Sequence, residues 1–119
     1  HKENGLSTIH ILDEIVLAPD AIAQVLQLLE EHYLPGLPAR QTLSLQQRWV
    51  SPPVQLENQN NTLWLLWEVT DAYGYYTMRG TADEGVMRFW AEVDQLCRER
   101  RRHVMGDATQ PLPQPLEDA

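Results

Sequence analysis

The patterns that define several common protein classes are missing from this chain of 119 residues. Its single cysteine, Cys97, cannot form an intrachain disulfide and belongs to no CxxC metal or redox motif. The sequence has no GxGxxG or Walker loop, no HExxH and no serine in a nucleophile elbow, which removes the usual dinucleotide, triphosphate, zinc and serine-nucleophile sites. We therefore expect no metal site and no bound organic cofactor.

Positive charge and long apolar runs are also scarce. The chain has 9 lysines and arginines against 17 aspartates and glutamates, a formal net charge of −8, and a surface of this sign repels the phosphates of nucleic acid. No apolar run approaches the roughly 20 residues of a membrane-spanning helix, and the first residues lack the apolar core of a signal peptide. The composition predicts a soluble, cytoplasmic globular protein that binds neither nucleic acid nor membranes.

Length and composition predict one folded domain, residues 1–106, followed by a tail, residues 107–119. The tail, DATQPLPQPLEDA, is proline-rich, acidic and almost free of large apolar side chains, so most of it is not expected to fold. Either its early residues, Thr109–Leu112, or the preceding His103–Met105 are candidates for a short edge strand.

The first half of the domain predicts a strand, a helix and a second strand. Residues 7–17 are rich in β-branched and aliphatic side chains and stop at Ala18-Pro19, which is typical of a strand before a turn. Apolar residues at helical spacing follow, up to Pro35-Gly36. The members of this stripe are Ile22, Val25, Leu26, Leu29 and Tyr33. Residues 42–50 alternate as a second strand, which Ser51-Pro52-Pro53 terminates.

The second half predicts a hairpin and a second helix. The polar residues 57–61 form a hairpin loop before a strand at 62–69, and Asp71–Gly80 is a candidate for a short helical turn. The Thr81-Ala82-Asp83-Glu84 capping box starts a helix that runs to Cys97. With a terminal strand, the order β-α-β-β-α-β predicts an α+β, ferredoxin-like sheet with both helices on one face.

The strand at 62–69 is apolar on both faces, with Leu63, Leu65 and Trp67 on one and Trp64 and Leu66 on the other. Two helices cover only one face of such a sheet. A bare second face is an apolar patch of a kind that soluble monomers rarely expose. We therefore expect a homodimer that forms through this face of the sheet.

The order of elements and three short segments carry a resemblance to a known group of proteins. The segments are HYLPG (His32–Gly36), LLWEV (Leu65–Val69) and FWAEVD (Phe89–Asp94). Over roughly residues 7–105 the chain resembles the small dimeric α+β barrel proteins, which include NIPSNAP-like and antibiotic-biosynthesis-monooxygenase-like domains and muconolactone-type isomerases. The resemblance implies sheet-to-sheet dimerisation and a pocket between sheet and helices in each subunit, and it selects no reaction.

Aromatic residues are predicted to line this pocket, and such walls suit a flat apolar ligand. The alternative is that they fill the core. The candidates are Trp49, Trp67, Tyr73, Tyr75, Tyr76 and Trp90.

Two histidines are candidates for proton transfer, because imidazole titrates near neutral pH. His32 lies near the end of the first helix, where its alternative role is to complement the helix dipole. His10 lies mid-strand with Glu14 on the same face, so that the two can relay protons. A hydrogen-bonded interface histidine is the alternative for His10.

Two groups of basic residues remain. Arg48 is expected on the face of Ser44 and Gln46, where it can hold a carboxylate or enolate; pairing with Glu68 or Glu14 is its structural alternative. The run Arg98–His103 is expected at the last turn of the second helix, where cations complement the helix dipole.

The sequence leaves two functions open. The first is binding of a small apolar, cyclic or acidic metabolite, and the resemblance implies as its enzymatic form a cofactor-independent isomerase, cyclase, lyase or monooxygenase in catabolism or secondary metabolism. In that form His32 or His10 moves a proton and Arg48 holds an oxyanion. The second is a non-catalytic ligand-binding or accessory interaction protein.

Overall fold

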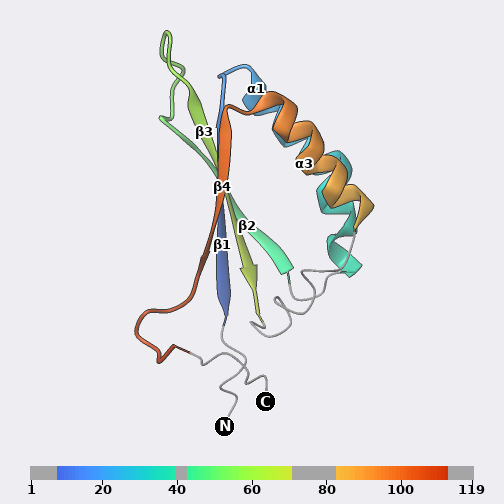
Figure 1. The fold of residues 1–119 in the computed structure, drawn as a ribbon, viewed down its shortest axis with the longest axis vertical. Helices are drawn as coiled ribbons and strands as arrows, with labels where there is room; N and C mark the ends of the chain where they lie inside the picture. The colour runs from blue at the N-terminus through green and yellow to red at the C-terminus, as the bar shows by residue number, and fades with distance from the viewer. Residues whose placement is uncertain (1–7, 40–42, 71–82, 113–119) are drawn as a thin grey trace.

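A computed structural model describes residues 8–39, 43–70 and 83–112 of the chain. Four antiparallel strands form a sheet in the order β2-β3-β1-β4, and the helices form one layer on one side of it (Figure 1). The elements are β1 (Ile9–Leu17), α1 (Ala21–Leu28), a π-helix (Leu29–Tyr33), a 3-10 helix (Leu34–Ala39), β2 (Leu43–Ser51), β3 (Asn61–Val69), α3 (Glu84–Leu96) and β4 (Glu99–Met105). This is the predicted ferredoxin-like α+β fold.

The core lies between the sheet and the helices. Every second side chain of β1 and β3 is buried and points towards α1 and α3; we call this side of the sheet the inner face and the opposite side the outer face. The predicted alternation of both strands is confirmed. The largest fully buried core side chains include Trp67, Phe89, Ile11, Ile15, Leu17 and Leu29.

The first helix changes its winding instead of ending at Pro35-Gly36. The α-helix ends at Leu28, a π-helix follows to Tyr33, and a 3-10 helix runs through both residues to Ala39. Proline is tolerated there because the first residues of a helical segment donate no backbone hydrogen bond within it. The predicted stripe is confirmed, with Val25, Leu29 and Tyr33 fully covered and Ile22 and Leu26 partly covered.

The N-cap of helix α3 lies two residues after the predicted one. It is Asp83, whose carboxylate accepts a hydrogen bond from the Val86 backbone N–H at 3.1 Å, whereas Thr81 lies outside the described residues. Near this end α3 approaches the π-helix closely. A Cβ atom on Gly85 would lie 2.2 Å from the carbonyl oxygen of His32, so only glycine fits between the two backbones.

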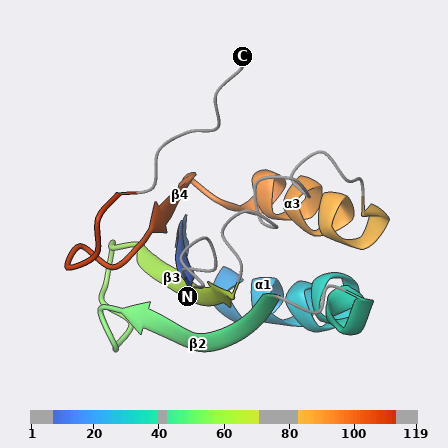
Figure 2. The ribbon, with the colours of Figure 1, turned by 90° about the horizontal axis from the view of Figure 1, so that it is seen from below.

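A β-bulge between Leu45 and Gln47 changes the faces of β2. Beyond it Arg48 pairs with the inward-facing Leu65 and Trp49 with the outward-facing Trp64. The prediction that Arg48 shares a face with Ser44 is therefore wrong, because one extra residue reverses the alternation. The bulged strand also bends, as Figure 2 shows.

The basic run belongs to a strand rather than to the end of the second helix. Helix α3 ends at Leu96, and Glu99–Met105 form β4, an edge strand paired with β1. The predicted strand at His103–Met105 is thus confirmed and begins earlier, while Thr109–Leu112 form no strand. The helix prediction fails because Arg100 and Arg102 point inward to carboxylates, an arrangement with the period of a strand.

Candidate functional site

A buried carboxylate lies at the centre of the inner face. Asp13 is 2% exposed, although it occupies a position in β1 otherwise filled by aliphatic residues. Arg102 of β4 donates to it through both Nε and Nη2, at 2.8 and 2.9 Å from Oδ1 and Oδ2. The indole N–H of Trp67 donates to Oδ2 at 2.9 Å. Three hydrogen bonds thus satisfy a charge that would otherwise be costly to bury.

The π-helix places a tyrosine over this ion pair. The ring of Tyr33 stacks on Trp67 with a centroid distance of 4.5 Å, and its hydroxyl oxygen accepts a hydrogen bond from Arg102. Phe89 of α3 meets the Tyr33 ring edge to face at 5.4 Å. A phenol that accepts from a cation is a stronger donor for a further hydrogen bond.

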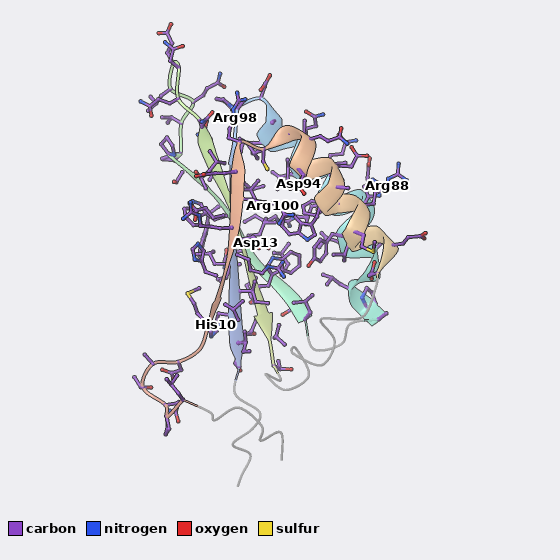
Figure 3. All side chains as sticks on the ribbon, viewed as in Figure 1. His10, Asp13, Arg88, Asp94, Arg98 and Arg100 are labelled. Carbon is purple, nitrogen blue, oxygen red and sulfur yellow. The ribbon has the colours of Figure 1, made fainter. Side chains whose placement is uncertain are left out.

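The margin between α3 and β4 carries two guanidinium groups around one indole. The carbons Cζ of Arg100 and Arg102 lie 4.4 and 5.7 Å from the ring centroid of Trp90, within cation–π reach. Asp94 of α3 binds the Arg100 guanidinium through both carboxylate oxygens, and Figure 3 shows the two residues between β4 and α3. Arg102 keeps 34% of its side chain exposed, so its charge is reachable from this margin.

Neighbouring groups and burial shift the pKa values of Arg102, Asp94 and Cys97. Burial alone lowers the pKa of Arg102, but the hydrogen bonds and charge of Asp13, with a smaller effect of Tyr33, outweigh it and raise that pKa above its ordinary value. Hydrogen bonding to Arg100 lowers the pKa of Asp94. Burial raises the pKa of the Cys97 thiol, so the thiol stays protonated and is a poor nucleophile.

We call Tyr33, Trp90, Arg100 and Arg102 the arginine–aromatic cluster. It combines flat apolar walls with a fixed positive charge and hydrogen-bond donors. Such a set can hold a planar molecule with a carboxylate or a developing oxyanion. Within the described ranges no group of three or more histidine, cysteine or carboxylate side chains is arranged to hold a metal.

The structure does not bring the predicted catalytic residues together. His32 lies in the π-helix, with Nε2 at 4.0 Å from Glu31 Oε1 and a partly exposed ring. His10 lies on the outer face, opposite Glu68 and Met105 in the neighbouring strands. The sheet therefore separates the two histidines.

Arg48 and Glu14 have partners other than the predicted ones. Arg48 Nη1 donates to Glu30 Oε2 at 2.9 Å, which ties the edge strand β2 to the π-helix. Glu14 lies 3.0 Å from His103 Nε2 rather than pairing with His10, because β4 lies next to β1.

The predicted aromatic residues are divided between the two faces. Trp67 and Trp90 lie on the helix side, where Trp67 is fully buried and Trp90 partly so. Trp49 lies on the outer face and is half exposed. The segment with Tyr73, Tyr75 and Tyr76 lies outside the described residues.

Neither Asp13 nor Arg102 was among the predicted site residues. In the alternation of β1, Asp13 lies on the same face as the buried Ile11 and Ile15. A charged residue at a position that a strand buries is rare in proteins, so the sequence itself indicates that Asp13 is unusual. No local signal identifies its partner, because Arg102 is 89 residues away in the sequence.

The sheet order, the helix layer and the inward-facing ion pair define an α+β protein of the ferredoxin-like class. No protein-family model and no curated protein matches the sequence. Among solved structures, a NIPSNAP family protein from Agrobacterium tumefaciens is similar, with 13% identity, coverage of 91% of this chain and 92% of that chain, and a TM-score of 0.63. A putative antibiotic biosynthesis monooxygenase from Caulobacter crescentus has 8% identity, 87% and 92% coverage and a TM-score of 0.63.

A NIPSNAP domain protein from Burkholderia xenovorans is also similar, with 13% identity, coverage of 87% of this chain and 98% of that chain, and a TM-score of 0.62. These likenesses confirm the predicted resemblance at the level of the fold. No helix in the described part of the chain is long and apolar enough to cross a membrane.

Proposed function

We propose that the chain forms a homodimer through the outer face of its sheet. The outer face carries a central apolar area, and no helix of the described segments covers it (Figure 1). The apolar side chains are Leu12, Val16, Trp49, Trp64 and Leu66, from three neighbouring strands. A second copy of the same face buries this area and matches it in shape by symmetry.

Replacement of Trp64 by glutamate tests the homodimer. We expect the wild-type chain to sediment at twice its mass of 13.7 kDa and Trp64→Glu to sediment as a folded monomer, because the variant places a charge at the centre of the apolar area. Met87→Glu is the matched control, since Met87 is exposed on α3, away from the outer face. A monomeric wild-type chain at micromolar concentration would contradict the proposal.

We further propose that each subunit binds a small planar anion at the arginine–aromatic cluster. The observation that carries this proposal is Arg102, a permanently charged and partly exposed group that Asp13 holds beside Trp90. A guanidinium has five N–H donors; Asp13 accepts two and Tyr33 one, which leaves donors for a ligand carboxylate. The apolar rings suit the rest of a flat molecule.

The groups of the arginine–aromatic cluster are also suited to a reaction that needs no cofactor. A reaction that forms an enolate or phenolate gains stabilisation from the positive charge of Arg102. Isomerisation, cyclisation and oxygenation of an enolisable substrate all pass through such an anion. One of the similar structures is described as a putative antibiotic biosynthesis monooxygenase. Binding without turnover of any enolisable substrate would instead favour the non-catalytic alternative.

Benzoate, with benzyl alcohol as its uncharged counterpart, tests the ligand class. We expect benzoate to quench tryptophan fluorescence and bind at least tenfold more tightly than benzyl alcohol. Arg100→Gln should weaken benzoate binding about tenfold, because a charge-assisted hydrogen bond contributes about 1.5 to 3 kcal/mol. Arg88→Gln is the control, because Arg88 lies on the solvent side of α3 (Figure 3). Equal binding of both compounds would refute the proposed class.

A further inference from the structure

The loop between β2 and β3, residues 52–60, projects from the sheet as an arm. Figures 1 and 2 both show it on the side away from α1 and α3, where the outer face lies. The arm follows β2, the strand that carries the bulge at Leu45/Gln47. We call residues 52–60 the hairpin arm.

The hairpin arm is held in one conformation from its base. Asn61 is buried, and its side-chain amide donates to the carbonyl oxygens of Pro52 at 2.9 Å and Val54 at 3.1 Å. The backbone N–H of Gln59 donates to the Leu56 carbonyl oxygen at 3.3 Å, which closes the tip. Ordering such a loop therefore costs little when it binds a partner.

The hairpin arm exposes apolar side chains and is almost uncharged. Val54 is 55% exposed and Leu56 40% exposed, and the adjoining Trp49 on the outer face is 50% exposed. Glu57 is the only ionisable residue among residues 52–60. An open hollow of about 690 Å³ lies between the arm, whose Leu56 lines it, and Ala18, Pro19 and Arg98 of the same subunit.

We infer that the hairpin arm of each subunit packs against the second copy in the homodimer, with Val54 and Leu56 buried on it. This inference rests on the proposed homodimer. A stable interface takes about 800 Å² of accessible surface from each partner. The exposed Val54 and Leu56 of the arm add apolar surface to that of the outer face.

The double variant Val54→Ser/Leu56→Ser tests the arm. We expect the dimer dissociation constant from sedimentation velocity to rise at least tenfold, while the circular dichroism spectrum stays unchanged because neither side chain is part of the core. Met87→Ser/Leu112→Ser is the matched control, since it removes two exposed apolar side chains that lie outside the arm. Its dissociation constant should equal that of the wild type.

An isotope-filtered NOE experiment on a mixed dimer gives a second, direct measurement. Labelled Val54 and Leu56 methyl groups should show NOEs to protons of the unlabelled copy. The inference about the arm would be overturned if the arm variant left the dissociation constant unchanged and the arm methyl groups showed no intersubunit NOE. If Trp64→Glu still dissociated the wild-type dimer in that case, the proposed homodimer would stand. A monomeric wild type would overturn both.

Discussion

Replacing Arg102 by leucine should lower the free energy of unfolding by about 3 kcal/mol. Among the described residues, the change leaves the Trp67 indole N–H as the hydrogen-bond donor to the buried Asp13 carboxylate. An unpaired buried charge is among the most costly single defects in a folded protein. Because the arginine side chain is itself partly exposed, we place the loss at the lower end of the range for buried pairs. Urea denaturation followed by circular dichroism measures it.

Arg88→Leu is the control for this measurement. Arg88 is exposed on α3, so its loss should change the free energy of unfolding by no more than about 0.5 kcal/mol. If Arg102→Leu cost less than about 1 kcal/mol, the ion pair would contribute no more than an exposed surface pair. The central role given to Asp13 in the site would then be untenable.

Replacing Gly85 by alanine should destabilise the protein by about 2 kcal/mol, as is typical of overpacking. Alanine is a better helix former than glycine by up to about 1 kcal/mol, so helix propensity alone predicts the opposite sign. The new Cβ atom, however, would lie 2.2 Å from the His32 carbonyl oxygen, and a backbone atom cannot rotate away. Helix α3 must then separate from the π-helix that positions Tyr33.

Gly106→Ala separates this steric effect from a general effect of glycine. A Cβ atom on Gly106 meets no atom within 4 Å, so the free energy of unfolding should stay within about 0.5 kcal/mol of the wild-type value. Thermal and urea denaturation of the two variants give the comparison. Equal stability of Gly85→Ala and wild type would mean that α3 moves away from His32 at no cost.

The sequence predicts the fold well where burial alternates with a regular period. Strands β1 and β3 and the stripe on the first helix follow from the spacing of aliphatic residues alone. Strand β4 does not, because its inward-facing residues include Arg100 and Arg102, whose inward orientation depends on carboxylates of other elements. The basic run is typical of a solvated helix end, but it forms an edge strand because Asp13 and Asp94 bind two of its arginines.

The site is predictable only in part, for two physical reasons. The strand period groups Trp67 with Leu63 and Leu65, and Trp90 lies beside the buried Phe89 on α3, so both pack against the core. The side of Arg48 depends on a single bulge residue, and a bulge has no strong local signature in this sequence. The Asp13–Arg102 pair joins the first and last strands, so only the complete sheet order reveals it.

The π-helix has a consequence for the whole first helix. Its buried residues Ala21, Val25, Leu29 and Tyr33 are each four positions apart. In a continuous α-helix each such step rotates the side chain by about 40°, so the row would spiral away from the sheet. The wider π turn, with hydrogen bonds between residues five apart, winds the row back. The helix thus meets the sheet along a single ridge, which ends with the Tyr33 ring stacked on Trp67.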